Sequence, residues 1–377
     1  MNQTKLLRTY SMGIALVLIW LFFTVATDNF LSARNLSILS IEMAVTATLA
    51  LGMLLVLLPG QIDLSVGSGV GLIGGIAAVL IFNHHWNAFA AMGAGLAVAL
   101  VIWGLMGTLI IQYRVPAFII TLGGLLVFKG LFWKVIDSET VPVVAGAGDN
   151  ALSLLTTHYL TPAQGFLLLG VIAFFVIRAS VRQRSQRAKY GFELESSSTA
   201  ILKIFVALQA LLLIILVMNQ FRGVPLSVVV LGIVAFSVYI ITMHTRFGRY
   251  LYAVGGNKEA AILSGVPVKK VIIGAYVMLG GIVALTGFMQ TAYSGASTTT
   301  IGNLMELDAI AACVIGGTSL AGGRGNVLGV LIGALIMATL LNGMTLMAVA
   351  PETKFIARGT VLALAVWLDV YLSQKAD

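Results

Sequence analysis

The sequence predicts an all-α, polytopic membrane protein with about 10–12 transmembrane segments, some of them broken or re-entrant. The chain of 377 residues is 59% hydrophobic and only 10% charged, and its mean hydropathy is +1.02. A soluble domain carries roughly 25% charged residues. Many apolar runs approach the roughly 20 residues needed to cross a bilayer. The alternating pattern of outer-membrane strands is missing, so we expect the spans to be helices.

Apolar segments follow one another along the chain and predict one transmembrane domain over residues 1–377. The first segment follows Lys5 and Arg8, and no small-residue cleavage site follows it, so we expect a retained span. Segments 64–82, 116–136 and 307–321 are short or interrupted by glycine and are candidates for half-helices. The predicted segments are 10–27, 36–59, 64–82, 88–111, 116–136, 164–181, 201–219, 226–243, 271–292, 307–321, 327–347 and 355–372.

Basic residues indicate how the chain is oriented. The net charge is +8. If every segment crosses the membrane, the loops 112–114, 182–200 and 244–270 lie on the same side, and many of the basic residues are found in them. Positive charge beside spans favours the cytoplasm, so both termini are expected there. The 182–200 loop is basic and then serine-rich, and we expect it to be flexible. No basic stripe interleaves with aromatic residues, which argues against nucleic-acid binding.

A hydrophilic segment in the 244–270 loop predicts a short cytoplasmic helix. Asn257 can cap a helix that begins at Lys258, and Gly265 can end it two turns later. Basic residues flank the segment on both sides, as expected for a cytoplasmic loop. A soluble partner could push on such a helix, so the loop predicts a membrane protein that another subunit drives from inside the cell.

Asp63 is the first candidate for a residue in the translocation pathway, because polar groups inside apolar runs are costly and informative. It follows a proline and a glycine that break the incoming helix. Asp63 can serve as N-cap of a helix starting near Leu64, with Ser65 in the first turn. The broken junction can also line a sugar-sized, hydrogen-bonding cavity, and the two roles are compatible.

A second polar group precedes the apolar segment 307–321. Glu306 and Asp308 complement the positive N-terminal end of the expected helix, and together with Asn303 they are further pathway candidates. The glycines at 316–317 and 322–325 lack the lysine and the strand–loop–helix context of a nucleotide-binding loop. They favour close helix packing or a broken helix.

No pattern in the sequence predicts catalysis, a metal or a cofactor in this chain. Cys313 is the sole cysteine, and four histidines are present. The pair His84 and His85 has no further ligands in its neighbourhood, which makes it a weak metal signal. Lys129 lies within an apolar stretch, and we expect it to extend to an interface.

Three ordered motifs resemble the permease subunits of bacterial monosaccharide ABC importers, of the ribose/xylose/galactose group. They are IDLSVGS at 62–68, GRYLYAVGGN at 248–257 and LDAIAACVIGGTSLAGG at 307–323. The resemblance runs from about Phe30 to Trp367. YRVPAFI at 113–119, the basic insert at 182–189 and SSTA at 197–200 are most similar to permeases for D-xylose. Segment 201–220 is less similar to the group.

The resemblance implies a homodimer in the bacterial inner membrane, with both termini cytoplasmic. Cytoplasmic ATP-binding subunits would dock beneath it and bind ATP and Mg²⁺, and a periplasmic sugar-binding protein would deliver a monosaccharide such as D-xylose. This chain would then be no enzyme. Its coupling residues would be Gly255, Gly256, Asn257, Glu259, Ala260, Ala261, Ser264 and Gly265.

The alternative is a secondary sugar transporter that an ion gradient drives. Such carriers need charged residues inside the membrane as ion sites, for which Asp63 and Lys129 are candidates. That alternative leaves the hydrophilic helix at 257–265 without a role.

Overall fold

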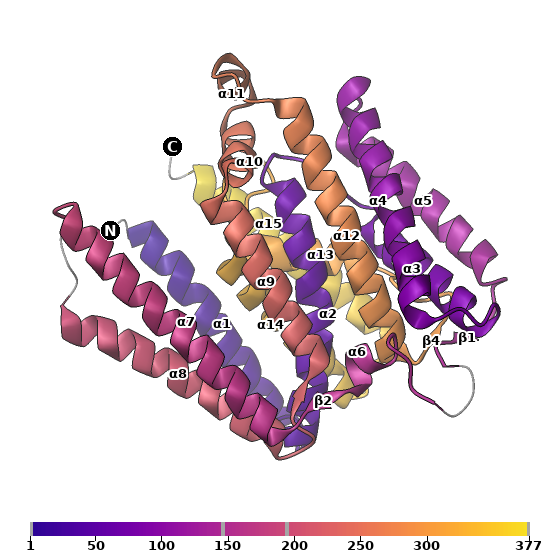
Figure 1. The fold of residues 1–377 in the computed structure, drawn as a ribbon, viewed down its shortest axis with the longest axis horizontal. Coiled ribbons are helices and arrows are strands. Elements are labelled where there is room, and N and C mark those ends of the chain that lie inside the picture. The colour runs from indigo at the N-terminus through magenta and orange to yellow at the C-terminus, as the bar shows by residue number, and fades with distance from the viewer. Residues whose placement is uncertain (1–2, 145–147, 193–195, 375–377) are drawn as a thin grey trace.

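The computed structural model describes residues 3–144, 148–192 and 196–374. In these ranges the chain forms a bundle of helices that run between two faces of the molecule (Figure 1). The helices are α1 (Gln3–Ala26), α2 (Ala33–Leu57), α3 (Val66–Phe82), α4 (Ala88–Gln112), α5 (Ala117–Val135), α6 (Leu154–Thr157), α7 (Pro162–Lys189), α8 (Ser197–Asn219), α9 (Leu226–His244), α10 (Arg246–Gly256), α11 (Lys258–Leu263), α12 (Val268–Ser294), α13 (Met305–Ile315), α14 (Val327–Leu346) and α15 (Pro351–Gln374). The strands are β1 (Val141–Pro142), β2 (Tyr159–Leu160), β3 (Val224–Pro225) and β4 (Ala296–Ser297).

The prediction of a polytopic helical membrane protein is confirmed. Eight described helices are long and apolar enough to span a bilayer, namely α2, α4, α5, α7, α8, α9, α12 and α14. The other four predicted segments form α1, α3, α13 and α15. Helices satisfy their own backbone hydrogen bonds, which lipid requires of any segment that it surrounds.

Two of the three suspected half-helices are short in the structure. Helix α3 has 17 residues and α13 has 11, so at 1.5 Å per residue they reach about 26 and 16 Å, less than the roughly 30 Å of a bilayer core. The third expectation, for 116–136, is wrong. Helix α5 is continuous from Ala117 to Val135. Alanine-sized side chains at Gly123 and Gly130 would meet no other atom within 4 Å, so these glycines mark no break.

The core forms around α2. In its most apolar stretch 72% of the residues are buried, against 61% in α12 and 67% in α14. Helix α12 packs on α2, α3 and α4, and α14 packs on α2 and α13. Small residues permit this close packing. In the most apolar stretches of α7 and α8 only 6% and 11% of the residues are buried, so these two helices lie at the periphery.

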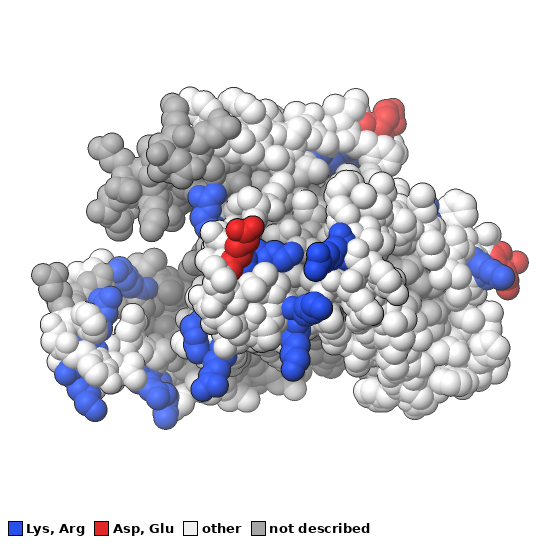
Figure 2. Space-filling model, turned by 90° about the horizontal axis from the view of Figure 1, so that it is seen from above, with Lys and Arg blue, Asp and Glu red and all other residues white. Residues whose placement is uncertain are grey.

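The two faces of the bundle differ in structure and charge. The short helices α10 and α11 and the turn between α4 and α5 lie on one face, and the two strand ladders lie at the other (Figure 1). Viewed from the α11 side, the molecule presents many basic and few acidic side chains (Figure 2). We call this the basic face. The ladders pair β1 with β4 and β2 with β3, both antiparallel.

Helices α7 and α8 form a hairpin, and its ends meet at a strand ladder. β2 immediately precedes α7 and β3 follows α8, and the two strands pair as Tyr159 with Pro225 and Leu160 with Val224. The chain therefore leaves the bundle and returns to it at adjacent points.

In the loop expected at 182–200, the described residues 182–192 and 196–200 are largely helical, and residues 193–195 lie outside the described ranges. α7 continues through Lys189, and Arg184 donates a 3.0 Å hydrogen bond to the Ser197 hydroxyl of α8. The side chain of Ser196 caps α8 by accepting from the backbone N–H of Thr199. Basic residues are good helix formers, so the charge that ends the apolar run does not end the helix.

Candidate coupling and translocation site

The chain between α2 and α3 breaks sharply at residues 58–65. Gly60 has φ +75°, a conformation that glycine adopts at little cost. Asp63 then accepts hydrogen bonds through Oδ1 from the backbone N–H of Ser65 at 2.7 Å and from its hydroxyl at 2.6 Å. Through Oδ2 it accepts from the indole N–H of Trp103 on α4, at 2.9 Å. The side chains of Asp63, Ser65 and Trp103 are fully buried. Asp63 therefore connects the segment between α2 and α3 to α4 through a buried hydrogen bond.

The capping role expected for Asp63 is wrong in its register. α3 begins at Val66, two residues later than predicted, and Ser65 is its N-cap residue rather than part of the first turn. The Ser65 side chain makes no capping hydrogen bond, because its hydroxyl donates to Asp63 instead. The carboxylate therefore stabilises the turn before the helix and not the helix end itself.

Replacing Asp63 by Asn should destabilise the protein by about 1–2 kcal/mol, because an amide cannot accept from both Ser65 and Trp103 as the carboxylate does. Trp103→Phe removes the indole donor of the hydrogen bond to Asp63 and should lower the stability by a similar amount. The measurement is thermal unfolding in detergent. The double variant should lose little more than either single variant. Fully additive losses would show that the two side chains do not act together.

The two half-helices meet at their N-termini. A side chain at Gly67 of α3 would overlap the Glu306 carboxylate and the carbonyl oxygen of Gly302, just before α13. A cavity of about 30 Å³ lies beside this contact, and Ser68, Lys129, Asn303 and Glu306 are among its lining residues. Such a volume holds about one water and is too small for a sugar.

Charged side chains from α13, α15 and α5 lie near this contact. Glu306 and Asp308 are both buried. They lie at the N-terminal end of α13, as predicted, within its first turn, where the positive end of the helix favours a carboxylate. Arg358 of α15 lies with its Nε 3.3 Å from Oδ1 of Asp308. The Nζ of Lys129 lies 5.6 Å from the ring centroid of Trp133, one turn along α5. Sequence reasoning missed Arg358, although an arginine inside the last apolar segment is the kind of signal that points to a buried partner.

The 244–270 loop contains two helices rather than one. Asn257 caps α11 as predicted, by accepting from the backbone N–H of Ala260 at 2.9 Å, and Gly265 follows the helix with φ +77°. Helix α10 precedes it and was not predicted. The Thr245 side chain caps α10, and Leu251 and Val254 are buried on its inner face.

A glycine junction of Gly255, Gly256, Gly322 and Gly323 joins the end of α10 to the core. The backbone N–H of Gly323 donates to the carbonyl oxygen of Leu58 at 2.9 Å. A side chain at Gly255 would overlap this same carbonyl, and one at Gly322 would lie 2.9 Å from the Cα of Gly255. The predicted close packing at 322–323 is therefore found, and its partners are α10 and the end of α2.

Tyr252 adds a side-chain contact to the glycine junction. Its hydroxyl donates a 2.8 Å hydrogen bond to the carbonyl oxygen of Gly325. Burial raises the pKa of the Tyr252 phenol, so the hydroxyl keeps the proton that it donates. Helix α10 is thus joined by side-chain and backbone contacts to the segments that follow α2 and α13.

The expected coupling residues divide into two groups. Gly255 and Gly256 belong to the glycine junction, and Ala261 is buried. The exposed ones are Asn257, Glu259, Ala260, Ser264 and Gly265, and Gly256 at the edge of the glycine junction is exposed as well. Two apolar residues of α11 were missed, Ile262 with 54% and Leu263 with 89% of its surface exposed. Ile262 and Leu263 are adjacent, so they form a continuous apolar surface on α11 that a partner could cover.

Comparison with known proteins places the chain in a family. Residues 35–366 match the profile described as "Branched-chain amino acid transport system / permease component". The xylose transport system permease protein of Haemophilus influenzae is 39% identical over 371 residues, 98% of each chain. Its counterpart in Escherichia coli K12 is 40% identical over 96% of this chain and 92% of the relative.

A second group of relatives is more distant. The ribose import permease protein of Escherichia coli K12 is 33% identical over 94% of this chain and 92% of its own. No solved structure matches the chain. The matches cover both half-helices, the glycine junction and α11. The chain belongs to the family of permease components of transport systems that this profile describes.

Proposed function

We propose that the chain is the membrane subunit of an ATP-driven importer that moves a monosaccharide, D-xylose or a similar pentose or hexose, across the bacterial inner membrane. The observation that carries the proposal is α11, which exposes Leu263 on the basic face while α10 fixes its base to the core. A cytoplasmic ATP-binding subunit would bind α11, and ATP and Mg²⁺ would bind to that subunit. No cofactor or catalytic residue is assigned to this chain.

The proposal also assigns the partners of the chain and its orientation in the membrane. Two copies of the chain would form a homodimer, and a periplasmic sugar-binding protein would dock at the face with the strand ladders. The start of α1 and the end of α15 lie towards the basic face (Figure 1), which supports cytoplasmic termini because positive charge favours that side. The profile describes a component of a transport system, which speaks against the ion-gradient carrier.

The sugar is assigned from the relatives. The permeases named for xylose are more similar to this chain than the one named for ribose. We place the pathway at the contact between α3 and α13, where Asn303, Glu306 and Asp308 would present oxygen and nitrogen atoms to the hydroxyl groups of a sugar. Asp63 and Ser65 would hold the broken helix in place beside it.

The experiment is uptake of labelled xylose into proteoliposomes that contain this chain, its candidate ATP-binding subunit and its sugar-binding protein. Uptake that requires ATP and all three proteins is the expected result. Uptake by this chain alone along a proton or sodium gradient would overturn the proposal. Stimulation of ATP hydrolysis by a binding protein loaded with another sugar would retain the importer and change the substrate.

Leu263→Asp should uncouple the importer, because it puts a charge into the apolar contact proposed for α11. We expect sugar-stimulated ATP hydrolysis to fall at least tenfold, equivalent to about 1.4 kcal/mol of lost coupling, while membrane insertion stays normal. Tyr190→Asp is the matched control, since Tyr190 is 69% exposed at the end of α7, away from α11. Equal effects of both substitutions would contradict a specific contact at α11.

A further inference from the structure

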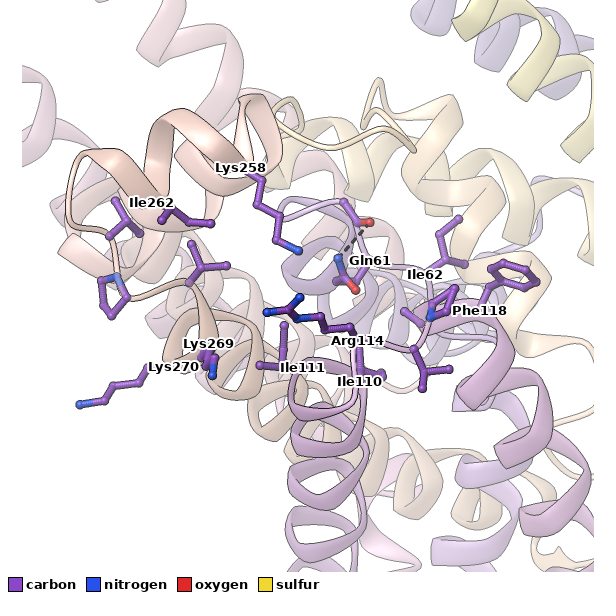
Figure 3. A pocket seen from close by; sticks show the side chains of 17 residues that line it. Gln61, Ile62, Ile110, Ile111, Arg114, Phe118, Lys258, Ile262, Lys269 and Lys270 are labelled. Atoms are coloured by element: carbon purple, nitrogen blue, oxygen red, sulfur yellow. Dashed lines mark hydrogen bonds between the residues drawn. The ribbon is translucent and has the colours of Figure 1, made fainter.

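A cavity of about 950 Å³ opens on the basic face beside α11. The segment 60–62, the end of α4, the turn between α4 and α5, helix α11 and the beginning of α12 enclose it (Figure 3). This cavity, which we call the basic pocket, is separate from the small cavity between α3 and α13, and the two share no lining residue.

Four cations and no carboxylate line the basic pocket. They are Arg114, Lys258, Lys269 and Lys270. Arg114 and Lys258 extend towards each other across the opening, beside the Gln61 amide, whereas Lys270 points away (Figure 3). Like charges that converge from separate elements repel one another, and a bound anion relieves this repulsion.

Two helix N-termini add to the positive potential. α5 and α12 both begin at the pocket, after Pro116 and Pro267, and neither has a side-chain cap. The first backbone N–H groups of a helix lack partners within the helix, and the aligned peptide dipoles favour an anion there. These N–H groups supplement the Arg114 guanidinium, whose fork of donors suits a phosphate.

The rest of the lining is aliphatic. Ile62, Ile110, Ile111, Ile262 and Val266 form apolar walls next to the cations. The volume exceeds what inorganic phosphate alone would fill, so the preferred ligand carries a phosphate group on a larger body.

We propose that the basic pocket is a binding site for a phosphate-bearing ligand, with the phosphate between Arg114 and Lys258 and the remainder along the isoleucines. The phosphate can belong to the headgroup of an anionic lipid or to a soluble phosphate ester of the cytoplasm. In either case the ligand touches Lys258 and Ile262 of α11 and also Gln61 of the broken segment, and so connects the two.

Binding is measured on the full purified chain in a neutral detergent. Ribose 5-phosphate is the soluble probe, with ribose as its phosphate-free counterpart, and titration calorimetry gives the Kd. Dioleoylphosphatidylglycerol is the lipid probe, with dioleoylglycerol as its counterpart, and native mass spectrometry gives the retained fraction. Preference for one phosphate probe identifies the source of the ligand.

Arg114→Gln with Lys258→Gln should weaken binding of the preferred probe about tenfold or more, because two charge-assisted contacts are lost. Arg246→Gln with Arg249→Gln is the matched control, since it removes two exposed cations of α10 that do not line the pocket. If the first double variant melts below the wild type, Lys258→Gln alone replaces it.

Two results would overturn the site. One is that neither phosphate probe binds better than its phosphate-free counterpart. The other is that both double variants lose binding equally, which would reduce the effect to overall charge. Both results would leave the proposed import function intact, because that function is tested separately by uptake and does not require that the pocket bind a phosphate.

Discussion

Replacing Gly255 by alanine is expected to destabilise the protein by about 3 kcal/mol or more and to abolish productive binding of the ATP-binding subunit. The added methyl group would overlap the carbonyl oxygen of Leu58 and the backbone nitrogen of Gly323. These are backbone atoms, which cannot move aside by a rotamer change, so the strain exceeds that of ordinary overpacking. The end of α10 would have to separate from the core, and α11 would move with it.

Gly256→Ala is a closely matched control for this prediction. A side chain at Gly256 would meet no other atom within 4 Å, and alanine favours a helix more than glycine does. We expect thermal unfolding of this variant to match the wild type. If both variants unfold at the same temperature, the glycine junction is not tightly packed, and α10 is not fixed to α2 and the segment after α13 as described.

Replacing Arg358 by methionine is expected to cost about 3 kcal/mol, because it leaves the Asp308 carboxylate buried without its cation. The side chains of Asp308 and Arg358 are 6% and 21% exposed, with 3.3 Å between Nε and Oδ1. Breaking a buried pair on one side is far more costly than removing both charges. The methionine retains much of the apolar stem that Arg358 packs against its neighbours.

The double variant Asp308→Asn with Arg358→Met separates charge from packing. It should recover most of the stability lost in Arg358→Met, as followed by thermal unfolding in detergent. A double variant as unstable as Arg358→Met would mean that the arginine acts through packing. Sugar uptake by the double variant would also show whether the charges serve transport or only hold α13 against α15.

The sequence was sufficient for features with a local cause. Asn257 and Gly265 lie at the two ends of α11, as predicted. A helix cap and a glycine in the left-handed conformation depend only on the neighbouring backbone. Helix α10 was predictable too, since Phe247, Leu251 and Val254 recur at helical spacing after the capping residue Thr245. The basic residues of this loop were interpreted only as a signal for the orientation of the chain in the membrane.

Features that depend on distant partners were not predictable from the sequence. Asp63 was expected to cap α3, and the decisive partner is Trp103, which lies 40 residues away. The pairing of Asp308 with Arg358 joins two helices whose contact no local pattern indicates. Glycines were ambiguous in the same way, since Gly123 and Gly130 of α5 face open space, while Gly67 and Gly255 lie against other backbone segments.

The hairpin of α7 and α8 has a consequence for how this chain could have acquired its present length. The hairpin begins and ends at paired strands and adds little to the core. A stretch of gene encoding it could therefore be gained or lost without redirecting any other helix. Sequence drift should be faster there than in α2, since few neighbours constrain each position, and lineages of transporters could lengthen or shorten this region independently of the machinery for import.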